Sequence, residues 1–138
     1  MSLVHLPVLD TITRAEQGVP VTIRRPDTGE PVTTRGTPLV LVVQGSDSRA
    51  YQGALAEVAE ARASAAAKGE KMDVRDFTAE VLSRVTLGWD GVFTADGAPV
   101  AFSQAVALEM YRSFPVLADQ VDAFVGQRAN FMRASSND

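Results

Sequence analysis

The chain has 138 residues, of which 46% are hydrophobic and 22% charged, and its formal net charge at pH 7 is −4. These values are typical of one soluble globular domain, and the acidic balance argues against nucleic acid as a partner. The chain contains no cysteine, which excludes disulfides and thiolate metal sites, and no apolar run approaches the about 20 residues that span a membrane.

Residues 1–18 are predicted to form an N-terminal arm, because Pro7 disfavours a helix through the middle of this segment. The apolar side chains of the arm are candidates for binding a partner or a second copy of the chain: Leu6, Val8, Leu9 and Ile12. The alternative is that these four side chains complete the core of the domain. We predict one α+β domain over residues 19–133 and a disordered tail over residues 134–138.

The residues that follow the arm have the pattern of a small antiparallel sheet of about three strands. Val21 and Ile23 alternate with polar residues, as in a half-buried strand, and residues 26–29 (PDTG) have the composition of a β-turn. A strand resumes at Val32, and the apolar run at residues 39–43 is typical of a buried central strand.

Four helices are predicted after the sheet. Their start signals are Ser46–Ser48, Asp73, Ser103 and Pro115. Gly69 is suited to end the first helix, and the second is expected to end at or near Gly88. The second helix has an apolar stripe of Val74, Phe77, Val81, Leu82 and Val85. The last has a stripe of Leu117, Val121, Phe124, Val125 and Phe131. The helical spacing of the aromatic residues, a set that contains Phe114, indicates core for most of them.

Gly88, Trp89 and Gly91 are interpreted as a structural pivot between helices. Gly88 would end the second helix with a positive φ, Gly91 would turn the chain again, and Trp89 would fill the junction. On that interpretation, truncating Trp89 to alanine costs about 3–5 kcal/mol of stability.

Few residues could support catalysis. The lone histidine, His5, lies near the chain end without an evident orienting partner, and no glycine-rich phosphate loop or serine elbow occurs. Asp119 and Asp122 are three apart on a predicted helix and make a paired-carboxylate candidate, but a solvated helix face explains them better. We therefore expect a protein that is not an enzyme, with no catalytic residues, no cofactor and no metal.

Several short motifs occur together in one order. The C-terminal half contains VLSRVTLGWDGV at residues 81–92 and DGAPVAFSQAVALEMYRSFPVLADQVDAFVGQRANF at residues 96–131. Upstream, Gly45, Asp47, Ser48 and Tyr51 open an alanine- and glutamate-rich helix. In this order and spacing, over roughly residues 20–132, the sequence resembles the tail assembly chaperones of long-tailed bacteriophages and prophages.

The resemblance implies a function without catalysis. A tail assembly chaperone coats the tape-measure protein in the cytoplasm of the host bacterium and keeps it soluble. It leaves as the tail-tube protein polymerises, and many such chaperones also exist in a frameshifted, extended form. The second interpretation is a structural minor tail protein or head–tail connector that stays in the virion and uses its sheet edge for subunit contacts.

Overall fold

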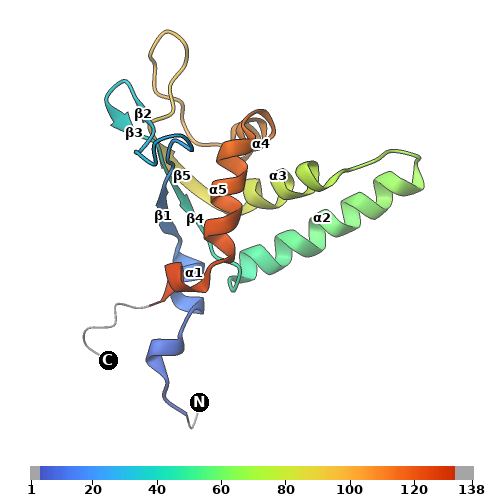
Figure 1. Ribbon diagram of the computed structural model, residues 1–138. Helices are drawn as coiled ribbons and strands as arrows, with labels where there is room; N and C mark the ends of the chain where they lie inside the picture. The colour runs from blue at the N-terminus through green and yellow to red at the C-terminus, as the bar shows by residue number, and fades with distance from the viewer. Residues whose placement is uncertain (1–3, 133–138) are drawn as a thin grey trace.

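The computed structural model describes residues 4–132, so the predicted disordered tail at residues 134–138 lies outside the described residues. The helices are α1 (Ile12–Gln17), α2 (Arg49–Ala67), α3 (Val74–Val85), α4 (Gln104–Ser113) and α5 (Pro115–Gly126), with short 3-10 turns η1 (Pro7–Leu9) and η2 (Arg128–Phe131). The strands are β1 (Val19–Thr22), β2 (Thr33–Thr34), β3 (Thr37–Pro38), β4 (Val40–Val43) and β5 (Thr86–Asp90). The architecture is α+β, as predicted (Figure 1).

The main sheet has three antiparallel strands in the order β1-β4-β5. Leu41 at its centre pairs with Val21 on one side and with Trp89 on the other. The sequence pattern predicted the third strand of this sheet near residues 32–34. In the structure it comes from residues 86–90 instead. Strands β2 and β3 instead pair with each other across Arg35 and Gly36, whose φ angles of 50° and 78° suit a tight hairpin turn.

The expected helix end at Gly88 is wrong. Helix α3 ends at Val85, and Thr86 already has extended backbone (φ −87°, ψ 129°) as the first residue of β5. The reason is long-range: β4 has β1 on one edge, and residues 86–90 supply the hydrogen-bonding partner for its other edge. Gly88 has no positive φ, whereas Gly91 does, at 83°.

The predicted helix starts are confirmed by their capping bonds. The side chains of Ser48, Asp73 and Ser103 each accept a hydrogen bond from the backbone N–H three residues later, at 3.0, 2.9 and 3.1 Å. Pro115 occupies the first turn of α5, and Gly69 follows α2 with a φ of 78°.

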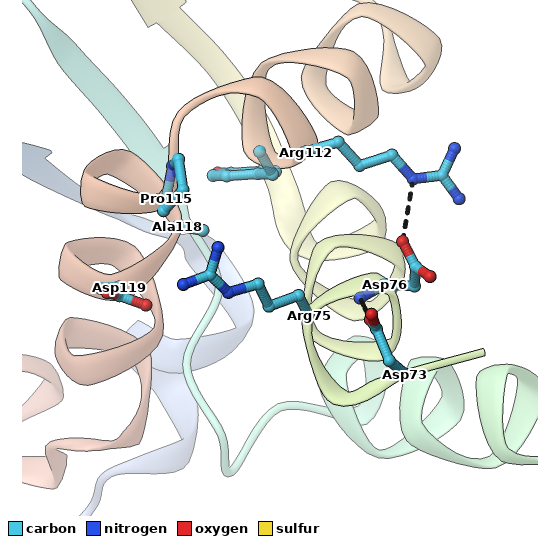
Figure 2. Close-up of a pocket in the computed structure, with 8 residues that line it drawn as sticks. Asp73, Arg75, Asp76, Arg112, Pro115, Ala118 and Asp119 are labelled. Carbon is cyan, nitrogen blue, oxygen red and sulfur yellow. Dashed lines mark hydrogen bonds and ion pairs between the residues drawn. The ribbon is translucent and has the colours of Figure 1, made fainter.

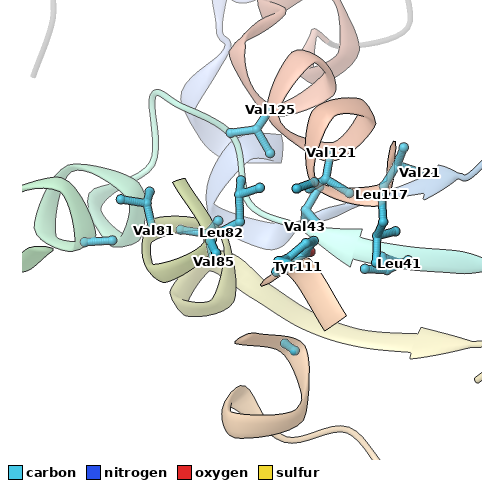
Figure 3. Packing of buried hydrophobic residues seen from close by; sticks show 14 of the residues in the cluster. Val21, Leu41, Val43, Val81, Leu82, Val85, Tyr111, Leu117, Val121 and Val125 are labelled. Atoms are coloured by element: carbon cyan, nitrogen blue, oxygen red, sulfur yellow. The ribbon is translucent and has the colours of Figure 1, made fainter. Parts of the chain in front are cut away.

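The core lies between one face of the sheet and helices α2 to α5 (Figure 3). Leu41 and Val43 point from the centre of the sheet into this core and are almost fully buried. The buried hydroxyl groups of Thr86 and Tyr111 share a hydrogen bond of 2.7 Å, which links the start of β5 to α4. Val74 is an exception to its predicted stripe: at the first position of α3 it stays 70% exposed.

The arm packs onto the domain through α1. Ala15 of this helix forms a small second core with Val19 and Phe131. Phe131 lies in η2 and not in the last helix, since α5 ends at Gly126, and its ring meets that of Phe124 edge-on at 5.6 Å. The part of the arm before α1 is the part that projects from the domain (Figure 1).

The two glycines beside Trp89 are expected to differ sharply when replaced by alanine. A Cβ on Gly91 would lie 2.6 Å from the carbonyl oxygen of Pro38 at a strained φ, so Gly91→Ala should cost about 1–3 kcal/mol or more. A Cβ on Gly88 meets nothing within 4 Å, so Gly88→Ala should change stability by at most about 0.5 kcal/mol. Urea denaturation of both variants tests this; equal losses would contradict the assignment of Gly91 as the turning point.

Candidate functional site

An apolar groove of about 420 Å³ lies at one end of the main sheet, where β1 ends and β4 begins. It is lined by Ile23, Val32, Thr34, Leu39, Gly91, Val92, Phe93, Met110, Phe114, Val116 and Leu117. None of these side chains is charged, and threonine supplies the only polar side chain among them. Such a lining favours an apolar ligand or an apolar segment of another protein.

One wall of the groove is positioned by the chain that leaves β5. Gly91 turns the chain next to Pro38, and Val92 and Phe93 follow directly. A hydrogen bond connects the strand before this segment to the chain that follows it: the indole Nε1 of Trp89 donates to the carbonyl oxygen of Val100 at 2.9 Å. This stretch thus forms and positions one wall of the groove.

Two of the three pivot residues, Gly88 and Trp89, therefore have different roles from those expected, and Gly91 turns the chain as expected. Trp89 is half-buried on a strand and does not lie between helices; its ring contacts that of Phe102 edge-on, with the centroids 4.8 Å apart. Because the ring is only partly enclosed, the 3–5 kcal/mol expected for a fully buried tryptophan is an upper bound for Trp89→Ala. Gly91 is a turning point, and Gly88 is an ordinary strand residue.

The opposite wall comes from the junction of α4 and α5. Phe114 and Val116 are 59% and 46% exposed, on either side of Pro115. Leu117 and Val121 take the inward positions of α5, so the first turn leaves Phe114 and Val116 pointing away from the core. The sequence interpretation of most aromatics as core did not identify Phe114; its place just before a proline, outside the α5 stripe, is the signal that could have done so.

The predicted partner-binding residues lie elsewhere on the surface. Leu6, Val8, Leu9 and Ile12 are between 38% and 63% exposed, so they do not complete the buried core. Leu9 and Ile12 line a shallow apolar hollow together with Met132. The structure thus brings two of the four together and places none of them in the groove.

A polar cluster fixes this part of the arm to the domain. The hydroxyl of Thr11 donates to Asp47 at 2.6 Å, and the guanidinium of Arg128 donates to both carboxylate oxygens of Asp47 at 2.8 and 3.0 Å. These two partners, Arg128 first, hold the pKa of Asp47 below its usual value of 3.8. One carboxylate thus joins the arm, the start of α2 and η2.

A second cavity, of about 210 Å³, is polar and lies between α3, α4 and α5 (Figure 2). Asp73, Arg75, Asp76, Arg112 and Asp119 are among the residues that line it. Arg112 forms a long ion pair of 3.8 Å with Asp76, which is an exposed contact of little energetic weight. Burial raises the pKa of Tyr111, which also lines this cavity, to about 12, so its hydroxyl stays protonated at neutral pH.

The candidate acid–base residues Asp119 and Asp122 line different hollows. Asp119 lines the polar cavity, whereas Asp122 lies beside Tyr51 in a separate small hollow. Partial burial and the neighbouring charge of Asp119 raise the pKa of Asp122, but the described neighbours include no nucleophile paired with it. His5 is exposed in the arm. Within residues 4–132, no three histidine, cysteine or acidic side chains are grouped so that they could hold a metal ion.

No helix among the described residues is long and apolar enough to cross a membrane. Comparisons with protein-family models, with curated proteins and with solved structures find no match to this chain.

The Asp47 cluster makes a testable contribution to stability. Because the folded-state pKa of Asp47 is lowered, its carboxylate stabilises the protein above about pH 4, and this contribution is lost as the pH falls through the folded-state pKa. Asp47→Asn should therefore lower the melting temperature at pH 7, and the difference from the wild type should shrink toward about pH 2. Asp90→Asn, which removes the same charge from an exposed residue at the end of β5, is the control. A difference that is independent of pH would contradict this role of Asp47.

Proposed function

We propose that the protein is a phage tail assembly chaperone, which binds the tape-measure protein in the host cytoplasm and keeps it soluble while the tail-tube protein assembles. The proposal joins the order of motifs over residues 20–132 to one structural observation. That observation is the uncharged groove with exposed Phe114 and Val116 at its rim.

The groove suits a client that presents apolar side chains along a helix. An amphipathic helix binds by placing its apolar residues in such a groove, and an uncharged lining leaves no buried charge unpaired. One groove of this size gives a modest affinity, but many copies along a long client add up through multivalency. The net charge of −4 helps to keep a protein with exposed apolar residues in solution.

The proposed role requires no catalysis. A chaperone that leaves its client on assembly needs a reversible apolar contact. The acidic and basic side chains around the polar cavity are explained by ion pairs between helices, such as those of Arg112 with Asp76 and Glu80. We accordingly propose no cofactor, no nucleic acid and no membrane as partners.

A structural tail or connector subunit is the second candidate, and one observation favours it. Among the described residues, β5 pairs only with β4, and it carries an exposed Leu87. An open strand edge of this kind can accept a strand from a neighbouring subunit. Stoichiometric amounts of the protein in purified virions would support this candidate and contradict the chaperone.

Co-expression tests the chaperone with a matched set of variants. The tape-measure protein encoded in the same genome is expressed alone, with the wild-type protein, and with the double variant Phe114→Ser/Val116→Ser. We expect the wild type to raise the soluble fraction of the tape-measure protein several-fold, and the groove variant to lose most of that gain. Both replaced side chains are largely exposed, so the variant should keep its fold.

Val74→Ser is the control, because it removes an exposed valine that does not line the groove. It should solubilise the tape-measure protein as well as the wild type does. The chaperone proposal is wrong if the wild type gives no gain in solubility. If the groove variant and the wild type give the same gain, the client binds elsewhere on the molecule.

A further inference from the structure

Two hairpins supply neighbouring parts of the groove lining. The first hairpin, residues 32–39, contains β2 and β3, and the second hairpin, residues 92–100, leads from β5 toward α4. Three residues of the first hairpin and two of the second line the groove. Both hairpins lie at the same end of the molecule (Figure 1), so their separation contributes to the width of the groove.

The second hairpin is held in shape by its own hydrogen bonds. The backbone N–H of Thr94 donates to the carbonyl oxygen of Ala98 at 2.8 Å, and that of Val100 donates to Val92 at 2.9 Å. The hydroxyl of Thr94 donates to Asp96 at 2.6 Å. These bonds fix the shape of the second hairpin and leave its orientation to other contacts.

Arg35 joins the tips of the two hairpins. Its Nη2 donates to the carbonyl oxygen of Ala95 at 3.1 Å. The same guanidinium lies against Gly97, because a Cβ built on that glycine would come within 2.7 Å of the arginine Cζ. Among the hydrogen bonds of residues 4–132, the bond to Ala95 alone connects the first hairpin with the second.

The place of Arg35 in its turn does not by itself explain an arginine. Arg35 is the one non-glycine residue with positive φ among those that the structure describes, at a position where a tight hairpin turn favours asparagine, aspartate or glycine. None of the ion pairs within residues 4–132 involves it. The contact with Ala95 and Gly97 is therefore what distinguishes an arginine here from the usual turn residues.

We propose that Arg35 is a positioning residue for the groove, which sets the separation of the two hairpins and thereby the width that a client helix meets. The base of the hairpins is fixed independently, since Gly91 packs against Pro38. The tips depend on Arg35. Without it the second hairpin moves outward together with Val92 and Phe93, and a bound client loses part of one wall. The inference rests on the proposed function for the client, whereas the separation is a property of the protein alone.

Distances between spin labels test the separation directly. The chain contains no cysteine, so nitroxides attach only where a cysteine is introduced. Thr33→Cys/Ala98→Cys places one exposed label on each hairpin. Electron paramagnetic resonance then measures the distance distribution, with the labelled protein diluted in unlabelled protein so that only pairs within one molecule contribute.

Four further substitutions are compared in this labelled background: Arg35→Ala, Arg35→Lys, Gly97→Ala and Gly69→Ala. The first removes the guanidinium, and Gly97→Ala places a methyl group where the guanidinium lies. Gly69→Ala is the matched control: its φ of 78° is similarly strained, but a Cβ there meets nothing within 4 Å, and it follows α2, outside the groove.

The expected result is a longer and broader distance distribution in both Arg35→Ala and Gly97→Ala. Arg35→Lys should restore the wild-type distribution in part, because an ammonium can donate to the carbonyl of Ala95 but has no planar group to lie against Gly97. Gly69→Ala should keep the wild-type distribution.

Three distance results would overturn the proposal. The first is an unchanged distribution in Arg35→Ala. The second is a shift that Gly69→Ala shares, since it would reflect general loosening of the fold. The third is an Arg35→Lys variant with no restoration, which would remove the hydrogen bond to Ala95 from the explanation.

The co-expression assay tests the consequence for a client. Arg35→Ala should lose part of the gain in soluble tape-measure protein, although Phe114 and Val116 are unchanged. Hairpins that separate while the gain stays at the wild-type level would overturn the role of groove width. If the wild type itself gives no gain, the chaperone proposal fails, and the distance measurement still decides whether Arg35 positions the hairpins.

Discussion

The fold depends on the hydrogen-bond partners that the backbone of β4 needs. This strand lies at the centre of the sheet, so its N–H and C=O groups need partners on both edges. Strand β1, nearby in sequence, satisfies one edge, and β5 reaches the other after two intervening helices. That pairing brings the end of α3 onto the sheet without a connecting loop, since Val85 ends the helix and Thr86 begins the strand.

The same pairing creates the groove. Once β5 lies against β4, the chain after Asp90 must leave the sheet at the end where β4 begins, and Gly91 allows it to turn against Pro38. The hydroxyl pair of Thr86 and Tyr111 fixes α4 relative to β5, and α4 in turn leads to Phe114. The groove is therefore a consequence of how the sheet is completed, and its walls come from segments distant in sequence.

Features set by neighbouring residues could be predicted from the sequence, and features set by distant ones could not. Ser48, Asp73 and Ser103 cap helices as expected, because a cap depends on residues within one turn. The sequence of residues 86–90 resembles a helix end followed by a glycine turn. These residues form a strand because they pair with β4, which lies far away in the sequence. The exposed arm residues were found by composition alone. The groove could not be predicted, because its walls meet only in the folded chain. Residues 33–34 were expected in the main sheet, but they pair with residues 37–38 in a hairpin instead.

Pro20 disfavours the addition of a further strand to the β1 edge of the main sheet. Ile23 donates to Leu39 across the pair, so the alternate residues Pro20 and Thr22 direct their backbone nitrogens to the free edge of β1. At Pro20 that edge lacks a donor, which makes it a poor template for another strand. In the main sheet, as described over residues 4–132, the β5 edge then remains to accept a strand, and two molecules joined there would leave no good edge of this sheet for a third. Pro20 thereby opposes the stacking of the β1 edge into a cross-β fibril.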